Sequence, residues 1–193
     1  MNDGHEPLTE SVRSLIDAVI RTEVDPEKIA AAHAHVAAAL DILGEQMMPG
    51  AYGVRAAPDG RRAPRGNVLI GERNAIAPPL IVDRDEAGLV STEVDLGAAY
   101  EGPVGHVHGG VCSLILDHLL GATAHRPDRP AFTGTLQLRY VRPTPLGPLR
   151  AEAWVEHEDG RKTYARGRIL SAGQTTVEAQ GVFIRPRADR SAG

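Results

Sequence analysis

Residues 105–124 read GHVHGGVCSLILDHLLGATA, and from Val111 onward this stretch has the composition of a buried helix. Between Val111 and Ala124 apolar side chains fall on nearly every side, and a helix without a polar face is usually buried. Asp117 lies in the middle of these apolar residues. A carboxylate in such surroundings costs free energy unless it is paired or functional, so Asp117 is a candidate catalytic residue. The alternative is a structural Asp117 that a hydroxyl or a backbone N–H satisfies.

The segments around this helix have the patterns of β-strands. Short runs rich in apolar residues are bounded by Gly and Pro, as expected for strands. Gly160 and Gly173 mark tight hairpin turns between the last runs. Two strands, one buried helix and then a four-stranded antiparallel meander predict an α+β domain in which an antiparallel sheet wraps around one central helix. The predicted strands are residues 76–83, 89–96, 131–141, 149–157, 163–170 and 175–184.

The N-terminal part of the chain predicts a helical extension. Apolar residues after Thr9 recur at helical spacing, and Thr9 is a suitable N-cap. Asp25 followed by Pro26 predicts the start of a second helix, which Gly44 ends. Residues 51–66 are rich in Gly, Pro and Arg without periodicity, which indicates a linker. We expect three parts, namely an N-terminal helical extension with its linker at 1–66, one domain at 67–187 and a disordered tail at 188–193.

Length and charge restrict the classes of function. A chain of 193 residues can form one domain core with a helical appendage. The formal net charge is −4 and no dense basic stripe occurs, so nucleic acid is not an expected partner. The single cysteine, Cys112, allows no intrachain disulfide and fits a reducing cytoplasm. The polar, acidic start and the lack of about 18 consecutive uncharged apolar residues predict a soluble cytoplasmic protein without a membrane partner.

Gly109 and Gly110 begin the predicted central helix. Glycines at a helix N-terminus leave backbone N–H groups accessible, and such groups can stabilise the oxyanion of an acyl-transfer reaction. The alternative is a pair of glycines that only makes a tight turn. Asp117 follows Gly109 by eight residues, which is about 12 Å along a continuous helix. One acyl group could hardly contact both within one chain, so a reaction that uses both predicts a site shared between the subunits of a homodimer.

Residues 100–110 read YEGPVGHVHGG, and Asp117 follows His108 by nine residues. This combination resembles the signature of PaaI-type hotdog-fold acyl-CoA thioesterases. Residues 140–143, which read YVRP, also look familial, and the resemblance extends over residues 67–185. It implies a hotdog fold and the hydrolysis of an acyl-CoA thioester to a free acid and CoA. It further implies that no cofactor takes part and that the protein is a homodimer or a dimer of dimers.

The resemblance also implies a role for each residue of the site. The Gly109 N–H, with or without the Gly110 N–H, polarises the thioester carbonyl, and His108 holds the site together and orients the thioester. Asp117 of the partner subunit either acts as a general base on water or attacks directly to give an anhydride. Thr133 lies where family members carry a Ser or Thr that positions the water or the aspartate. The alternative for Thr133 is a strand residue that only packs.

Two further residues are candidates for substrate binding. Ser113 lies one turn before Asp117 and either lines the site or bonds to a backbone carbonyl. Arg142 is one of several arginines whose guanidinium groups can meet the CoA phosphates. One departure concerns Gly102, because many PaaI-type enzymes carry Asn at this position, six residues before His108. The chain resembles a subgroup that lacks this Asn, so the choice between a general base and a nucleophile for Asp117 stays open.

Other chemistries compete for some of these residues. Four histidines near the motif lack a familiar metal-ligand spacing, so no metal is expected. Cys112 is either a nucleophile or, as is more common for such a cysteine, a small core residue. Two other functions remain, namely a hotdog-fold acyl-CoA hydratase or dehydratase and a non-catalytic acyl-CoA-binding protein. The presence of both Asp117 and Thr133 argues against the non-catalytic protein.

Overall fold

The computed structural model describes residues 4–50, 55–56, 62–78, 80–126 and 129–187. Tertiary contacts divide the chain into two compact units, Met1–Ile76 and Ala77–Gly193, and each is described by itself. Most of the predicted linker and the whole predicted tail at 188–193 lie outside the described residues. The expected three-part division of the chain stays a prediction.

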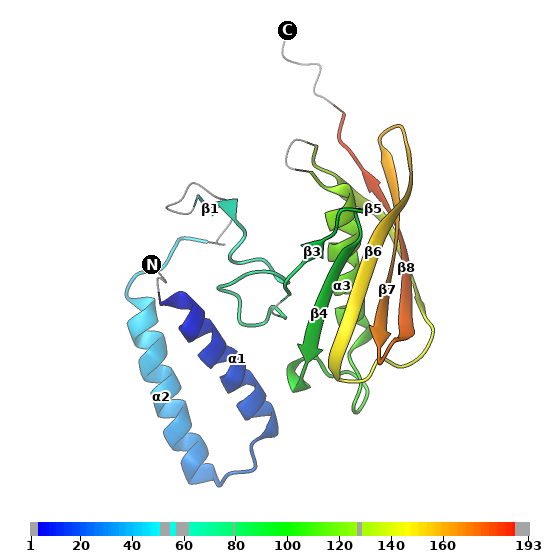
Figure 1. Cartoon of the computed structure of the whole chain (residues 1–193). Coiled ribbons are helices and arrows are strands. Elements are labelled where there is room, and N and C mark those ends of the chain that lie inside the picture. The colour runs from blue at the N-terminus through cyan, green and yellow to red at the C-terminus, as the bar shows by residue number, and fades with distance from the viewer. Residues whose placement is uncertain (1–3, 51–54, 57–61, 79, 127–128, 188–193) are drawn as a thin grey trace. The chain divides into compact units, whose positions relative to one another are not determined.

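The first unit contains two helices and a short two-stranded ribbon (Figure 1). The helices are α1 (His5–Arg21) and α2 (Pro26–Gly44), and in the ribbon β1 (Arg55–Ala56) pairs antiparallel with β2 (Arg62–Ala63). Among the helices of the described residues, none combines the length and the apolar character that crossing a membrane requires.

The start of α1 differs from the prediction. Thr9 is not the N-cap but lies within the helix, where its hydroxyl donates a hydrogen bond to the His5 carbonyl at 2.9 Å. The helix can begin earlier because Pro7 lies in its first turn, whose N–H groups have no intrahelical acceptor in any case. The start of α2 at Pro26, with Asp25 at the N-cap position, is as predicted, although the Asp25 side chain makes no capping hydrogen bond.

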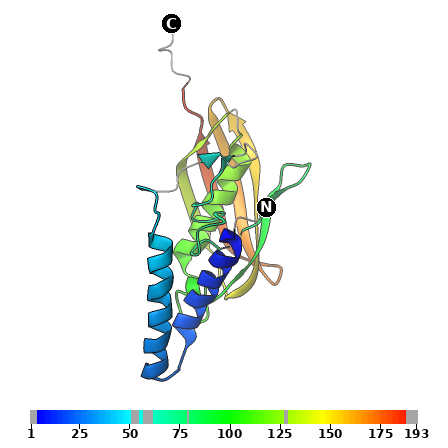
Figure 2. The ribbon, with the colours of Figure 1, turned by 90° about the vertical axis from the view of Figure 1, so that its left-hand side faces the viewer.

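The second unit is an antiparallel sheet packed against one long helix. All strand pairs are antiparallel, and the strand order is β3-β4-β6-β7-β8-β5. The helix α3 lies along one face of the sheet in both views (Figure 1 and Figure 2). The elements are β3 (Asp83–Arg84), β4 (Val90–Leu96), the 3-10 turn η1 (Ala98–Tyr100), α3 (Gly109–Ala124), β5 (Phe132–Tyr140), β6 (Gly147–Asp159), β7 (Lys162–Ser171) and β8 (Gln174–Ile184).

The core of this unit forms where the sheet meets α3. Ile115, Leu116, Leu119 and Leu120 of α3 are each no more than 1% exposed. Along β4, β6, β7 and β8 buried and more exposed residues largely alternate, so each strand turns one row of side chains toward the helix. The predicted arrangement of an antiparallel sheet around one buried central helix is confirmed.

Two details of the predicted sheet are wrong. Of the strand predicted at 76–83, only Asp83 belongs to β3, and the described residues before it form turns and irregular backbone. Pro78 contributes to this, because a proline has no N–H to donate to a neighbouring strand. The predicted meander is also only partly present. The strands β6, β7 and β8 are consecutive neighbours, but β5 pairs with β8 at the edge of the sheet rather than with β6.

The connection from β5 to β6 explains this strand order. It contains Pro143 and Pro145 and does not form a tight hairpin. Instead it bonds to the loop before α3, since the Val107 N–H donates to the Thr144 carbonyl at 2.8 Å and the Leu146 N–H donates to the Gly105 carbonyl at 3.0 Å. The chain thus passes from the edge strand to the middle of the sheet beside the start of α3. The predicted turns at residues 160 and 173 are present, and both glycines have positive φ.

Candidate active site

The structure brings Asp117 and Thr133 together. Asp117 is half-buried on α3, and Thr133 lies near the start of β5. The Thr133 hydroxyl donates a hydrogen bond to Asp117 Oδ1 at 3.0 Å. A carboxylate with a hydroxyl partner is satisfied in part, and its second oxygen remains able to accept a proton or a further hydrogen bond.

A β-bulge at Gly134 gives Thr133 this orientation. In the pairing of β5 with β8, Thr133 faces Phe183 and Thr135 faces Val182, so Gly134 is an extra residue. Side chains alternate along a regular strand, which would place residues seven positions apart on opposite faces. Because the bulge adds one residue, both Thr133 and Tyr140 point toward α3, where each makes a hydrogen bond.

His108 caps the N-terminus of α3. Its Nδ1 accepts a hydrogen bond from the Gly110 N–H at 2.9 Å, which satisfies one of the free donors of the first helical turn. A ring nitrogen that accepts a hydrogen bond carries no proton, so the proton of the neutral imidazole lies on Nε2. The exposed His108 ring can therefore offer an Nε2–H donor to a bound molecule.

The Gly109 N–H is the free donor at this end of α3. The N–H groups of Val111 and Cys112 donate to the His108 carbonyl, and that of Gly110 donates to the His108 ring. The Gly109 N–H donates no hydrogen bond within the part of the chain that the structure describes. A free N–H at the positive end of a long helix is suited to bind an oxyanion. Of the two glycines predicted as donors, Gly110 already has an acceptor.

Tyr140 contacts Gly109 from the sheet. Its hydroxyl donates a hydrogen bond to the Gly109 carbonyl at 2.8 Å. A Cβ added at Gly109 would lie 3.3 Å from three atoms of the Tyr140 side chain, so the ring packs directly over this glycine. Burial and the neighbouring Cys112 raise the pKa of the Tyr140 hydroxyl, so the group is a proton donor at neutral pH. The sequence singled out Tyr140 only as part of the YVRP run and assigned it no role.

Gly102 packs closely against His108. A Cβ at Gly102 would lie 2.7 Å from the His108 Cα and 3.0 Å from its Cβ, which is too close for any side chain without movement of the backbone. The loop is fixed in this position because the His108 N–H donates to the Tyr100 carbonyl and the Gly102 N–H donates to the His106 carbonyl, both at 2.9 Å. This close contact is a steric reason for glycine at position 102, where many PaaI-type enzymes carry Asn.

A pocket of about 690 Å³ opens beside Gly109. Tyr140, Cys112 and Arg142 line it, and the Arg142 guanidinium bonds to the Gln174 side chain. Burial raises the pKa of the Cys112 thiol more than its hydrogen bond with Thr144 lowers it, so this thiol is protonated at neutral pH. Such a thiol is a poor nucleophile, and the interpretation of Cys112 as a core residue is the better one.

The other predicted residues lie elsewhere on α3. Ser113 is half-buried and makes no hydrogen bond through its side chain within the described residues. Asp117 does not line the pocket beside Gly109, which agrees with the separation of about 12 Å along the helix. Burial lowers the pKa of the neighbouring His118, and the Asp117 charge partly opposes this shift. The residues that the structure describes contain no group of three His, Cys, Asp or Glu side chains placed to hold a metal.

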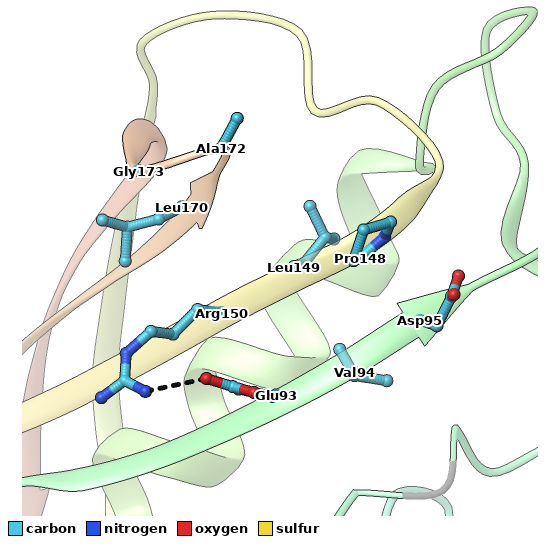
Figure 3. Close-up of a pocket in the computed structure, with 9 residues that line it drawn as sticks. All are labelled: Glu93, Val94, Asp95, Pro148, Leu149, Arg150, Leu170, Ala172 and Gly173. Atoms are coloured by element: carbon cyan, nitrogen blue, oxygen red, sulfur yellow. Dashed lines mark hydrogen bonds and ion pairs between the residues drawn. The ribbon is translucent and has the colours of Figure 1, made fainter.

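A second hollow of about 550 Å³ lies over β4, β6 and the turn after β7, and none of the predicted site residues lines it (Figure 3). Arg150, which lines this hollow, donates hydrogen bonds to Glu93 at 3.2 Å and to Glu152 at 2.7 Å. Figure 3 shows the pair that Arg150 forms with Glu93. These two carboxylates neutralise the guanidinium, so it is a weaker candidate for phosphate binding than Arg142.

Comparisons with known proteins agree with this architecture. The family model of the thioesterase superfamily matches residues 104–178. A crystal structure of a thioesterase superfamily protein is 32% identical with a TM-score of 0.83, and the match covers 95% of this chain and 92% of that one. The PaaI protein of the E. coli phenylacetic acid degradation operon is 17% identical with a TM-score of 0.52 over 56% of this chain and 80% of that one, and thus shares the fold.

A curated relative adds a second line of similarity. The acyl-coenzyme A thioesterase THEM4 of Xenopus laevis is 33% identical over 92 residues, which are 46% of this chain. The match spans only 41% of that relative. Together with the near full-length match to a solved structure, these similarities show that the chain belongs to the thioesterase superfamily and has its hotdog fold.

Proposed function

We propose that the protein is an acyl-CoA thioesterase that hydrolyses its substrate to a free acid and CoA. The observation that carries this proposal is the arrangement along α3. The free Gly109 N–H lies at the positive end of the helix, and the Asp117 carboxylate, held by Thr133, lies two turns further along. Thioester hydrolysis needs an oxyanion donor and a group that activates water or attacks the carbonyl, and these two features supply both.

In the proposed reaction the Gly109 N–H binds the thioester oxygen and stabilises the negative charge that develops on it. Asp117 then either takes a proton from a water that attacks the carbonyl carbon, or attacks that carbon itself to give an anhydride that water opens. In both cases the C–S bond breaks and CoA leaves as a thiol after it gains a proton. Thr133 orients the carboxylate, and the Nε2–H of His108 is a second donor on the substrate side.

The two halves of the site are proposed to come from different subunits. The strand β5 is an edge of the sheet, so its outer backbone groups can pair with a second copy. If two β5 strands pair antiparallel about Gln137, the extra residue Gly134 brings Thr133 opposite the partner's Tyr140. This arrangement would bring Asp117, which Thr133 holds, toward the partner's Gly109.

The acyl-CoA class of substrate is supported by the pocket and by the similarity to a protein named as an acyl-coenzyme A thioesterase. Arg142 brings a guanidinium to the pocket beside Gly109, and such a group suits a CoA phosphate. A hydratase or dehydratase is the second candidate. The Asp117 carboxylate bonds to a hydroxyl, whereas hotdog-fold hydratases usually centre on a His-Asp or His-Glu pair, and this contact favours hydrolysis.

A colorimetric thiol-release assay on a panel of acyl-CoAs tests the proposed activity. Hydrolysis predicts that each productive substrate releases one thiol and one free acid. A hydratase would change the absorbance of an enoyl-CoA without releasing thiol, and a non-catalytic protein would bind acyl-CoA but release none. Absence of thiol release from every acyl-CoA in the panel, by protein that binds them, would reject the thioesterase.

Subunit mixing tests the shared site. Asp117→Asn and a bulky Gly109→Trp variant are each expected to be inactive. A heterodimer of the two contains one site with both wild-type halves, so free exchange should restore about a quarter of the wild-type activity. Exchange that is demonstrated by differently tagged subunits, but restores no activity, would contradict a shared site.

A further inference from the structure

The peptide unit between Gly109 and Gly110 is held at both of its polar ends. Its N–H, from Gly110, donates to His108 Nδ1 at 2.9 Å, and its carbonyl, from Gly109, accepts a hydrogen bond from the Tyr140 hydroxyl at 2.8 Å. The two side chains come from different places, because His108 precedes α3 and Tyr140 ends β5. We call these two contacts the glycine clamp.

The clamp acts on the two glycines that begin α3. Two consecutive glycines lack Cβ atoms and have more conformational freedom than any other pair of residues. The free Gly109 N–H belongs to the peptide unit just before the clamped one, and the two units share the Gly109 Cα. Fixing the clamped unit therefore limits rotation about this Cα and holds the direction of the free N–H. An oxyanion donor stabilises a transition state only if it already points at the oxygen.

Tyr140 is suited to this role in two respects. It lies on a strand that pairs with β8 along most of its length, so the hydroxyl is held by the sheet and not by a loop. Its ring also covers Gly109, where an added Cβ would lie 3.3 Å from the ring atoms. The ring contact needs only an aromatic side chain, whereas the hydrogen bond to the carbonyl needs the hydroxyl. The two contributions can thus be separated by removing the hydroxyl alone.

We propose that Tyr140 is a positioning residue that, with His108, orients the Gly109 N–H toward the carbonyl oxygen of the substrate. The proposal rests on the proposed thioesterase function for the identity of that carbonyl. The Tyr140 hydroxyl does not itself touch the reacting atoms. It acts through the Gly109 carbonyl, so its loss should affect the transition state more than the binding of CoA.

Tyr140→Phe tests the proposal. We expect kcat to fall about tenfold while KM changes less than about twofold, because the lost interaction matters mainly when charge develops on the oxygen. Phenylalanine keeps the ring over Gly109, so the thermal unfolding midpoint should stay close to that of the wild type. Tyr164→Phe is the matched control, since it removes the hydroxyl of a tyrosine on β7 that stacks on His157 outside the site. Its kcat should equal that of the wild type.

Binding of two uncleavable CoA analogues gives a readout without turnover. One is S-butyl-CoA, a thioether without a carbonyl, and the other is a trifluoromethyl ketone analogue of an acyl-CoA, in which a methylene replaces the sulfur and whose tetrahedral hydrate resembles the charged intermediate of hydrolysis. Tyr140→Phe should weaken the binding of the ketone analogue several-fold and leave the binding of the thioether unchanged. Equal kcat and equal affinity for the ketone in folded Tyr140→Phe would overturn the proposal. Absence of thiol release by the wild type would instead reject the proposed function, and the analogue comparison would still test the clamp.

Discussion

The two groups that each chain contributes to the proposed sites lie on one helix but are held in different ways. At the start of α3 the functional group is the backbone N–H of Gly109, and the side chains of His108 and Tyr140 hold the neighbouring peptide unit. Two turns later the functional group is a side chain, the Asp117 carboxylate, which accepts a hydrogen bond from the Thr133 hydroxyl. One substitution can remove a side-chain group, whereas a backbone N–H can only be displaced. Substitution of Asp117 should therefore lower kcat the most, and substitutions of Gly109 and Thr133 should lower it less.

Asp117→Asn should have the largest effect. The amide keeps the size of the side chain but can neither accept the proton of water nor attack the carbonyl, so kcat should fall about a hundredfold or more. Substrate binding should persist, because the carboxylate is needed for the chemical step and the amide fills the same space. Thiol-release kinetics measure the first effect, and calorimetric titration with S-butyl-CoA measures the second. Near-normal turnover by the folded variant would remove Asp117 from the mechanism.

Gly109→Ala should have the next largest effect. The N–H remains, but the new methyl group meets the Tyr140 ring at 3.3 Å and displaces either the ring or the helix start. We expect kcat to fall between about tenfold and thirtyfold, because an N–H that no longer points at the oxygen stabilises the oxyanion much less. Gly121→Ala is the control within the same helix, since its methyl group would lie 3.4 Å from Phe183, an ordinary contact. Equal activity of both variants would mean that the geometry at Gly109 does not limit the reaction.

Thr133→Val should have a smaller effect on the same reaction. Valine keeps the β-branched shape and removes the hydroxyl that donates to Asp117 at 3.0 Å, so kcat should fall about tenfold. Thr133→Ser, which keeps the hydroxyl, should recover most of the activity. The bulge places Thr135 on the opposite face of β5, so Thr135→Val should leave kcat unchanged. An active Thr133→Val variant would reduce Thr133 to a packing role.

The smallest effect concerns stability near Asp117. Burial lowers the pKa of His118 in the folded protein below the ordinary value of 6.5, although the Asp117 charge partly opposes this. Well above pH 6.5 both the folded and the unfolded chain have a neutral His118. As the pH falls through that value, the unfolded chain binds a proton that the folded chain does not, so the free energy of unfolding decreases. His118→Gln should reduce this decrease, as urea unfolding at a series of pH values would measure. If the free energy of unfolding of His118→Gln had the same pH dependence as that of the wild type, His118 would not be the source of the decrease.

The sequence indicated more of the contacts at the Asp117 end of the site than at the Gly109 end. The central helix followed from its apolar composition, and the resemblance implied that Thr133 positions either the water or the aspartate. The structure has a hydrogen bond between Thr133 and Asp117, and the catalytic roles of both residues stay predictions. The role of Tyr140 could not be predicted in the same way. The extra residue Gly134 decides whether Tyr140 lies on the same face of β5 as Thr133. A bulge changes the alternation of side chains along a strand without leaving a clear pattern in the sequence.

The errors in the predicted fold also have identifiable physical causes. The place of β5 at the sheet edge depends on a proline-containing connection that bonds to the loop before α3, a contact between segments far apart in the chain. Thr9 has the chemistry of an N-cap, but it lies inside α1 and bonds to the carbonyl of His5. The sequence pattern cannot distinguish a threonine at the N-cap from one inside the helix, because the hydroxyl can form a hydrogen bond in both positions.

The bulge at Gly134 has a consequence for the comparison of related sequences. Thr133 and Tyr140 are separated by an odd number of positions and yet share one face of β5. A relative in which the equivalent residues are an odd number apart must keep a bulge if both are to reach its central helix, and one with an even separation must lack it. A single-residue gap in an alignment of this strand would therefore mark a change in backbone geometry and not a neutral difference in length. Counting these positions would reveal the bulge in a chain whose structure is unknown.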